Sequence, residues 1–446
     1  MDKRTIAVIG SGISGLATAW LLREHHSVTL FEADTRLGGH SHTVTVDEDD
    51  RQVAIDTGFM VFNRPNYPLL YGLFEHLGIA SHPTDMSFSV SLDRGRLEYA
   101  GTGLRTLFAQ PGHLVSPGFL GMLRDIVRFN RLAHALLESS VPVSRSLEAF
   151  LRQHRFGRRF RDHYLYPMAA AIWSCPRERV GQFPASSFAR FFANHGLLDL
   201  RDRPTWRTPV GGASVYVDRL AADLAGRVRR GMPVQAVRRT ADGVLVQVAG
   251  RAPQRFDQVV LACHADQARR ILIDAQPAER ALLGCVAYQP NRVLLHRDAR
   301  LMPRRRSVWS SWNYLGQTDV TDEAAVSVTY WMNSLQRLGT PNDYFVSLNP
   351  LREPHDASVV AELSYSHPVF DGASMELPQR LRAVQGRDGV WYCGAWTGYG
   401  FHEDGLRSAV QVAQALGATI PWLPQLQASE RLLPRWRSAA QRSDAA

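Results

Sequence analysis

Three glycines near the start of the chain have the G-x-G-x-x-G spacing of a phosphate-binding turn. They stand between Thr5–Ile9, an apolar run that predicts a buried parallel strand, and Leu16–Leu22, which predicts a helix. In such a turn the first glycine permits a sharp bend, the second lets backbone N–H groups approach a pyrophosphate, and the third lets helix and strand pack closely. The N-terminus of the helix attracts the phosphates. The residues that we predict to bind a dinucleotide here are Gly10, Gly12, Ser14 and Gly15.

A carboxylate completes this pattern. The next strand-like run, Ser27–Phe31, ends at Glu32, which is placed to accept hydrogen bonds from an adenosine ribose. A carboxylate at this position favours NAD or FAD over NADP, whose ribose carries a phosphate. A glycine triplet alone is weak evidence, because a purely structural turn could supply it. Strand, glycines, helix, strand and acid occur here in the expected order, and this context supports the dinucleotide site.

Length and cysteine content limit the class of protein. At 446 residues the chain is long enough for two domains with a large core. It has no run of about 18 apolar residues that could span a bilayer, and the first strand begins too early to leave room for a signal peptide. The four cysteines lack C-x-x-C spacing, which indicates a reducing cytoplasm and argues against a structural zinc. We therefore expect a cytoplasmic protein without a metal site.

The positive charge is carried almost entirely by arginine. The formal net charge is +9, and Lys3 is the only lysine in the chain. Either a GC-rich genome or a basic face that adheres to anionic lipid would explain this bias. Nucleic acid is not expected as a partner, because no binding motif accompanies the charge. The segments that could contact a membrane are the amphipathic stretch Leu114–Leu137, the run Pro303–Arg306 and the tail Arg431–Arg442. An ordinary packed helix would explain the first of these equally well.

Further glycine-rich segments resemble a known family. Arg36–Thr43 contains a glycine pair after the second strand, Asp56–Asn63 follows a predicted hairpin, and Val390–Val410 closes the pattern. With the first turn, these segments resemble the flavin-containing amine oxidoreductase superfamily. Its members include monoamine oxidases, protoporphyrinogen oxidases, carotenoid desaturases and fatty-acid double-bond isomerases. The closer resemblance is to bacterial NAD/FAD-binding proteins associated with membrane-lipid modification, and it covers nearly the whole chain.

The resemblance implies FAD as the cofactor and extends the set of binding residues. Asp404 is expected to start a helix running from Leu406, whose N-terminus would stabilise the reduced flavin ring. His40 stands where relatives often have an arginine, and Ala395 where many have an acid. The residues implied to hold FAD besides the first turn are Glu32, Gly38, Gly39, His40, Val234, Gly394, Gly405 and Leu406.

The predicted fold class is α/β. We expect a Rossmann-like, doubly wound FAD-binding domain built from separated segments, with an inserted α+β substrate domain. The FAD-binding domain is predicted to comprise residues 1–62, 210–265 and 386–420; the substrate domain, residues 63–209 and 266–385; and an Arg-rich tail, residues 421–446. The aromatic runs Val308–Tyr314 and Val326–Met332 read as strands, which serve either as sheet core or as the floor of the substrate cavity.

The predicted active site cannot use a lysine. Amine oxidases of this superfamily commonly place a lysine near the flavin N5, whereas Lys3 precedes the first strand. The candidate catalytic residues are His402 and Glu403 as proton carriers, with His40 and His42 as alternates. The alternative for each is a structural hydrogen-bonding role.

We therefore predict an FAD-dependent oxidoreductase that acts on a long apolar substrate. The expected substrate is a fatty-acyl chain of phospholipid, and the expected reaction is desaturation or relocation of a double bond. Such a protein would be cytoplasmic, with peripheral contact to the inner face of the anionic membrane, and its oligomeric state stays open. Two alternatives remain at this stage: a flavin amine oxidase, and a non-enzymatic lipid-binding protein with the architecture of the Rab GDP-dissociation inhibitors.

Overall fold

The computed structural model describes residues 3–48, 51–138, 145–173, 177–198, 204–317, 327–370 and 377–424. Several predicted segments fall partly outside these ranges. The Arg-rich tail lies outside them from residue 425 onward, and so does the proposed membrane contact Arg431–Arg442.

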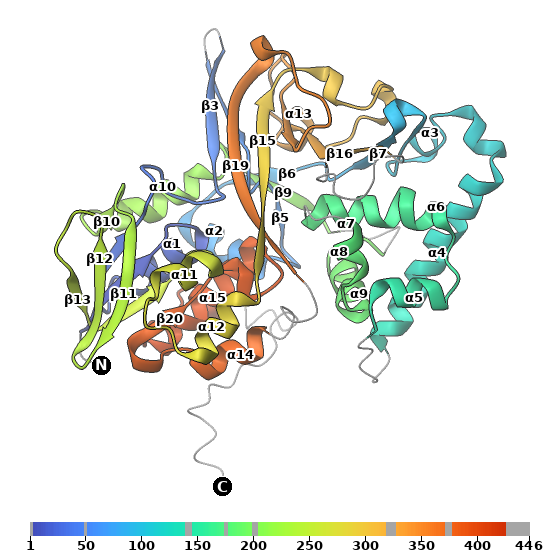
Figure 1. The fold of residues 1–446 in the computed structure, drawn as a ribbon. Helices are drawn as coiled ribbons and strands as arrows, with labels where there is room; N and C mark the ends of the chain where they lie inside the picture. The colour runs from blue at the N-terminus through green and yellow to red at the C-terminus, as the bar shows by residue number, and fades with distance from the viewer. Residues whose placement is uncertain are drawn as a thin grey trace.

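A five-stranded parallel sheet carries the glycine turn at the end of its central strand (Figure 1). Its first two strands in the chain are those that the sequence predicts over Thr5–Ile9 and Ser27–Phe31. In spatial order its strands are β10 (Val228–Arg229), β2 (Ser27–Phe31), β1 (Thr5–Ile9), β14 (Gln258–Leu261) and β20 (Val390–Tyr392).

Alternate residues of β1 face two different layers. Ile6 and Val8 pack against helices, whereas Ala7 and Ile9 pack against a second sheet and shorter helices. The helices on the first face are α1 (Ile13–Leu22), α2 (Pro68–Leu77), α10 (Ser214–Asp223) and α15 (His402–Ala415). The second face is covered by the antiparallel strands β11 (Val234–Thr240), β12 (Gly243–Val248) and β13 (Gln254–Phe256) and by α11 (Ala265–Ile271), α12 (Pro277–Gly284) and α14 (Leu377–Val384). The α/β class is confirmed, and the structure adds that a β-layer forms part of one face.

A second large sheet has seven strands and is antiparallel except between β16 and β7. Its strands in spatial order are β19 (Val359–Val369), β15 (Ala287–His296), β18 (Phe345–Leu348), β17 (Ser327–Trp331), β16 (Trp312–Gly316), β7 (Phe88–Leu92) and β8 (Leu97–Ala100). The predicted strand Val308–Tyr314 begins only at Trp312, because Arg306–Val308 forms a 3-10 turn. Figure 1 shows that the long strands β15 and β19 run from the parallel sheet into this second region.

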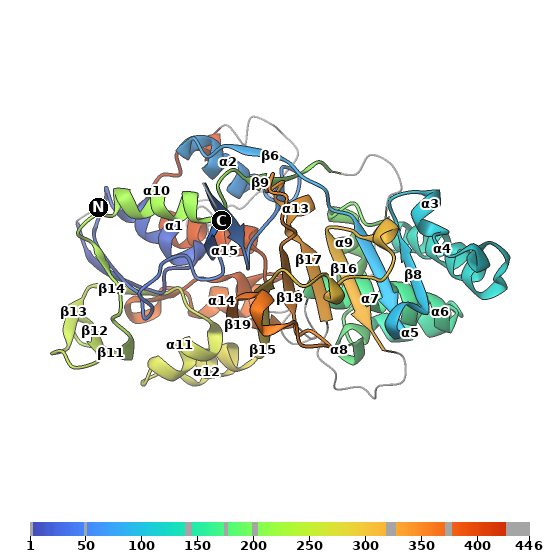
Figure 2. The same cartoon turned by 90° about the horizontal axis from the view of Figure 1, so that it is seen from above.

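Helices cover the far end of the seven-stranded sheet, as the view from above shows (Figure 2). They are α3 (Leu104–Leu107), α4 (Pro117–Glu138), α5 (Leu147–Gln153), α6 (Arg158–Phe160), α7 (Tyr166–Trp173), α8 (Arg177–Gly181) and α9 (Ala185–Asn194). Helix α4 covers most of the amphipathic stretch Leu114–Leu137, for which we expect either membrane contact or ordinary packing. Its Phe119, Met122 and Phe129 are buried in the core, so it has the packing of an ordinary amphipathic helix. Within the described ranges, no helix combines the length and apolar character needed to cross a bilayer.

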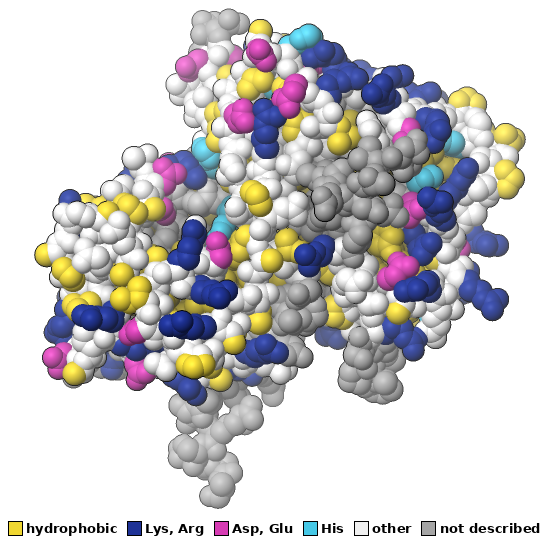
Figure 3. Space-filling view, in the orientation of Figure 1, with side chains coloured by type: hydrophobic (Ala, Val, Ile, Leu, Met, Phe, Trp, Pro, Cys, Tyr) yellow, Lys and Arg dark blue, Asp and Glu magenta, His cyan; other side chains and the backbone are white. Residues whose placement is uncertain are grey.

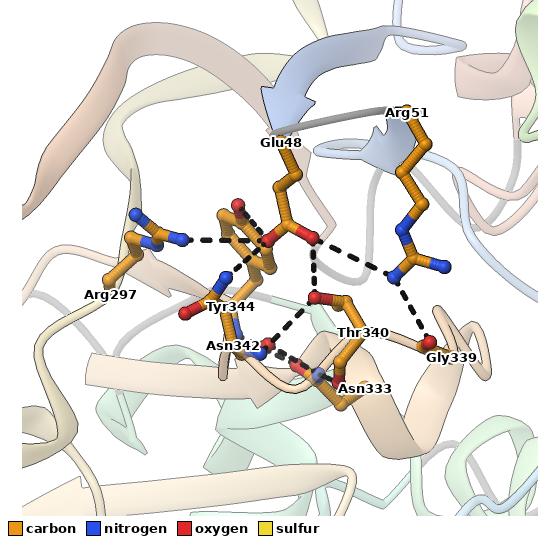
Figure 4. A network of polar contacts seen from close by, with 8 residues as sticks. All are labelled: Glu48, Arg51, Arg297, Asn333, Gly339, Thr340, Asn342 and Tyr344. Carbon is orange, nitrogen blue, oxygen red and sulfur yellow. Dashed lines mark hydrogen bonds and ion pairs between the residues drawn. The ribbon is translucent and has the colours of Figure 1, made fainter.

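A predicted hairpin, β3 (Thr43–Glu48) and β4 (Arg51–Asp56), links the two regions. Near its tip, the buried Glu48 carboxylate accepts hydrogen bonds from Thr340 Oγ1 at 2.5 Å, Tyr344 Oη at 2.6 Å and Asn342 Nδ2 at 2.9 Å (Figure 4). This network fixes the hairpin to the loop that follows α13 (Met332–Leu335). A small sheet of β5 (Phe62–Asn63), β9 (Trp206–Pro209) and β6 (Ser81–Pro83) completes the connection.

Candidate active site

A cavity of about 910 Å³ is lined by residues from both large sheets. At one end, its wall is formed by residues that directly follow the parallel strands: Gly10 after β1, Glu32 after β2, Ala262 and Cys263 after β14, and Gly394 two residues after β20. The carboxyl ends of parallel strands meet at one edge of a sheet, and that edge is where α/β proteins bind ligands. The topology therefore brings together segments that are nearly 400 residues apart in the chain.

The first glycine turn has the geometry of a pyrophosphate cradle. Gly10 has φ +102°, and a Cβ there would lie 2.8 Å from the carbonyl oxygen of Ala262. A Cβ on Gly15 would overlap the carbonyl oxygen of Gly10, whereas one on Gly12 would meet no atom within 4 Å. Gly12 therefore faces the open cavity, where an anion can approach the backbone. Helix α1 has no side-chain cap and no acidic residue in its first turn, so its N–H groups are free for phosphate oxygens.

Glu32 and the glycine pair extend this cradle. The Glu32 carboxylate lines the cavity and accepts hydrogen bonds from the Ser11 N–H at 2.8 Å and from Ser11 Oγ at 2.5 Å. A Cβ on Gly39 would lie 3.1 Å from the Cα of Gly12, so the two glycine turns approach each other closely. Val234 lines the same end of the cavity, as expected for a residue near the adenine. These features fit FAD.

The closing segment meets the first turn, but its helix begins earlier than predicted. Helix α15 starts at His402 instead of Leu406, because the Asp404 carboxylate accepts the N–H groups of Tyr399 and Phe401 at 3.0 and 3.2 Å and closes the first turn. A Cβ on Gly405 would lie 2.8 Å from Ser14 Oγ. Gly15, Gly405 and Leu406 are absent from the described cavity lining. Their role in the structure is to pack α1, α15 and the sheet together.

His402 lines the cavity as an enclosed, neutral imidazole. Its ring stacks on Phe59 with 3.8 Å between centroids, and its Nε2 lies 2.8 Å from Ser41 Oγ. Burial lowers the pKa of His402 to about 3. The side chain is therefore uncharged near neutral pH, which suits a hydrogen-bonding role better than that of a titrating acid.

The structure does not bring Glu403 to the cavity. Its side chain is 3% exposed, and its two oxygens accept the N–H groups of Leu69 and Leu70 at 3.0 Å each. Burial raises the pKa of Glu403 to about 7. A carboxylate that caps the N-terminus of α2 in this way serves the packing of α2 against α15. The assignment of Glu403 as a proton carrier is therefore corrected.

His40, the substitute for the usual arginine, is the centre of a group of imidazoles. Its ring centroid lies 5.5 Å from that of His367 and 5.7 Å from that of His264. Its Nε2 is buried and has no hydrogen-bond partner among the described residues. Burial lowers the pKa of His40 well below its usual value, and the neighbouring histidines lower it further. Because His40 lines the cavity, this nitrogen is available to a ligand bound there.

The sequence did not identify several residues that lie around His40 and the glycine pair. Arg36 donates hydrogen bonds to the carbonyl oxygens of Leu37 and Gly39 at 2.9 and 2.8 Å and so holds the glycine pair in place. Its position two residues before that pair could have identified it. Tyr365 and His367 come from β19, more than 300 residues later, and no local pattern marks them.

The other end of the cavity is apolar. Trp312 and Tyr330 line it, with ring centroids 4.9 Å apart, together with Val346 and Leu348. Each of the two predicted aromatic runs therefore contributes one ring to the cavity wall, Trp312 from the first and Tyr330 from the second. The Trp312 Nε1 is buried and unpartnered within the described structure. Among the described lining residues, Glu32 is the one carboxylate, and it lies at the nucleotide end.

Comparison with known proteins agrees with this geometry. Residues 13–333 match the model of the family described as flavin containing amine oxidoreductase. The carotenoid phi-ring synthase of Streptomyces griseus is 31% identical over 296 residues, which cover 62% of this chain and 55% of that protein. The chain thus matches about half the length of that relative.

Two solved structures illustrate the shared fold. The CLA-producing fatty acid isomerase from P. acnes superposes with a TM-score of 0.65 at 14% identity, covering 94% of this chain and 99% of the other. Cyclohexylamine oxidase from Brevibacterium oxydans superposes with a TM-score of 0.66 at 17% identity, covering 96% and 100%. At these identities the likeness is one of fold.

Proposed function

Because the chain belongs to the flavin-containing amine oxidoreductase family, it is an FAD-dependent oxidoreductase, and we propose that its substrate is a fatty-acyl chain. The proposed reaction is desaturation or relocation of a double bond. FAD, when bound, supplies the acceptor for a hydride from the acyl chain. The glycine turns, the N-terminus of α1 and Glu32 would hold its nucleotide part, and the closing segment would hold its ring.

The observation that carries this proposal is the unpartnered N–H of Trp312 in an apolar wall. A buried donor without a partner costs about 1–3 kcal/mol, so a bound substrate gains by offering it an acceptor. An acyl ester or carboxyl oxygen is such an acceptor, whereas an alkylammonium group is itself a donor. In addition, the described lining contains no carboxylate outside the nucleotide end that could pair with an ammonium. Both features favour an acyl substrate over an amine.

The protein side chains would exclude water and handle a proton. Removal of a hydride and a proton from neighbouring carbons gives a new double bond, whereas return of the hydride to a different carbon relocates one. His40 Nε2 lines the cavity without a partner among the described residues, and because burial lowers the pKa of His40 it would hold such a proton only transiently. His402 would hold Ser41 and the Phe59 ring in position through its contacts.

An amine oxidase is the second candidate. Trp396, Tyr399 and Phe401 line the cavity and could frame an amine with aromatic rings. The sequence offers no lysine near the flavin, and the described lining of the apolar end holds no carboxylate that could pair with an ammonium. The non-enzymatic alternative is not retained, since the family model that matches the chain is one of oxidoreductases.

A direct test uses the FAD-loaded protein without oxygen. We expect vesicles of dioleoyl phosphatidylglycerol to yield acyl chains with new or moved double bonds, detected by mass spectrometry. Putrescine and cyclohexylamine should leave the flavin oxidised. Trp312→Phe keeps a ring but removes the N–H, and it should raise the KM for the lipid more than it lowers kcat. Flavin bleaching with either amine, and unchanged acyl chains, would favour the amine oxidase.

A further inference from the structure

A second cavity, of about 350 Å³, lies on the opposite face of the seven-stranded sheet from the flavin cavity. Residues of the same strands alternate between the two: Trp312 and Tyr330 face the first cavity, and Leu315 and Thr329 face the second. We propose that this second cavity binds a phosphate group, either free or in the headgroup of a phospholipid. This site is separate from the flavin chemistry.

Three of the arginines that line the cavity carry uncompensated charge. Arg94, Arg304 and Arg352 form no ion pair with any carboxylate in the described ranges. The carboxylates nearby are already engaged, because Asp93 pairs with Arg96, Asp298 with Arg300, and Glu98 with Arg305. Guanidinium groups match phosphate oxygens in geometry and charge, so a group of free arginines around one cavity favours a phosphate ligand.

The backbone at Arg304 and the neighbouring Arg305 is fixed in position. The fully buried Glu98 carboxylate accepts the N–H of Arg304 at 2.7 Å and that of Arg305 at 3.2 Å. Gly95 has φ +89°, and a Cβ there would lie 2.9 Å from Arg304 Cδ, so the arginine stem lies against the glycine backbone. Because Glu98 is inaccessible to solvent, this support holds the loop in place from inside the domain.

Arg94 itself has an unusual backbone. Its φ is +55° in the turn between β7 and β8, a region that non-glycine residues rarely adopt. Such a conformation persists where the surroundings impose it, and it is concentrated at ligand-binding sites. The turn thus places the Arg94 guanidinium at the cavity, although glycine would adopt this backbone conformation with less strain.

The surroundings of the cavity also suit a lipid headgroup. In Figure 3, basic side chains gather over the upper right of the molecule, the region of β16, β7 and α3 in Figure 1. Leu351, next to Arg352 in the cavity lining, is 47% exposed. A phosphate bound by the arginines would leave an attached acyl chain beside this apolar side chain.

The test measures binding of inorganic phosphate and glycerol 1-phosphate to the FAD-loaded protein by calorimetry. Co-sedimentation with phosphatidylcholine vesicles, with and without phosphatidylglycerol, tests the headgroup. The variants are Arg304→Gln, Arg352→Gln and Arg94→Asn, the last because asparagine tolerates positive φ. Each should weaken binding about tenfold through loss of one charged hydrogen-bond donor group, with FAD content unchanged. Arg230→Gln, an exposed arginine outside both cavities, is the matched control.

The outcomes distinguish the two sources of phosphate. Binding of the soluble compounds that the three variants weaken would identify a site open to free phosphate. Binding confined to phosphatidylglycerol vesicles, again weakened by the variants, would identify a headgroup site. Absence of all binding would overturn the proposal, and so would an equal loss in Arg230→Gln, because the attraction would then be a general effect of charge.

Discussion

A methyl group on Gly405 would lie 2.8 Å from the hydroxyl oxygen of Ser14, so the first turns of α15 and α1 touch each other. These turns come from opposite ends of the described chain and stand beside the flavin cavity. Thr18 and Cys393 add a second contact between the same two ends, at 3.7 Å. The cofactor site therefore depends on close packing of α1 against α15, which leaves no room for a side chain at Gly405.

Gly405→Leu should separate the two helix N-termini. Overpacking at such a contact costs about 1–3 kcal/mol, and we expect a loss of this size in urea unfolding together with weaker retention of FAD. Gly121→Ala in α4 is the control, since a Cβ there meets no atom within 4 Å. It should be neutral or stabilising by up to about 1 kcal/mol, because alanine favours helix. Equal effects of the two substitutions would contradict the close packing at Gly405.

Gly12→Val should separate folding from cofactor binding. The Cβ of the added side chain would meet no protein atom within 4 Å and would face the open cavity, so thermal unfolding of the cofactor-free protein should change little. The same side chain would occupy the space of the pyrophosphate. We expect purified protein that is folded by circular dichroism but colourless. A variant with full yellow chromophore would place the phosphates elsewhere.

Glu48→Gln should weaken the link between the hairpin and the substrate region. Burial alone would raise the pKa of Glu48, but the hydrogen bonds from Thr340, Tyr344 and Asn342 outweigh this effect and lower it to about 2. The carboxylate thus stabilises the fold above its ordinary pKa, and this contribution disappears as the pH falls from about 4.5 toward 2. We expect a loss of about 1–3 kcal/mol at pH 7 in urea unfolding. The difference from the parent protein should shrink below pH 4.5, and a difference that grows there would contradict the assignment.

His296→Gln tests the opposite pH dependence. His296 is fully buried, accepts the Asp298 N–H at Nδ1, and lies 2.8 Å from Ser347 Oγ through Nε2. Burial lowers its pKa to about 4. Because the unfolded chain binds a proton near pH 6.5 and the folded chain does not, His296 destabilises the fold as the pH falls below that value.

This effect amounts to about 2 kcal/mol at pH 5 relative to pH 7.5. The glutamine variant cannot bind that proton, so the stability gap between parent and variant should narrow by this amount between the two pH values. Unfolding curves in urea at both pH values measure the gap. A constant gap would mean that His296 takes up a proton in the folded protein as readily as in the unfolded chain.

The parts of the site that local sequence could reveal are those made by short-range geometry. Gly10, Gly12 and Gly15 are required by one turn, and their spacing, together with the flanking strand, helix and Glu32, predicted the cradle that the structure contains. The start of α15 was misplaced because Asp404 acts at the third position of the helix, where its carboxylate reaches back to the preceding N–H groups. An acid near a helix start is compatible with either register, and only the hydrogen bonds decide between them.

The assignment of Glu403 failed for a different reason. Its partners, the N–H groups of Leu69 and Leu70, lie more than 300 residues earlier in the chain, and nothing near Glu403 in the sequence indicates them. The same distance hid His367 and Tyr365, which approach His40 only through the pairing of β19 with β15. Contacts between distant parts of the chain therefore decide whether a titratable side chain lines the cavity, as His367 does, or only stabilises the fold, as Glu403 does.

The order of strands in the parallel sheet has a consequence for synthesis of the protein. The central β1 leaves the ribosome first, but its neighbour β14 follows about 250 residues later and the edge strand β20 more than 120 residues after that. Pairings between such distant segments form slowly, since the intervening chain must first be closed into a loop. The FAD site can thus close only after β20 has been synthesised, and until β14 follows, one edge of β1 lacks its native neighbour in the sheet.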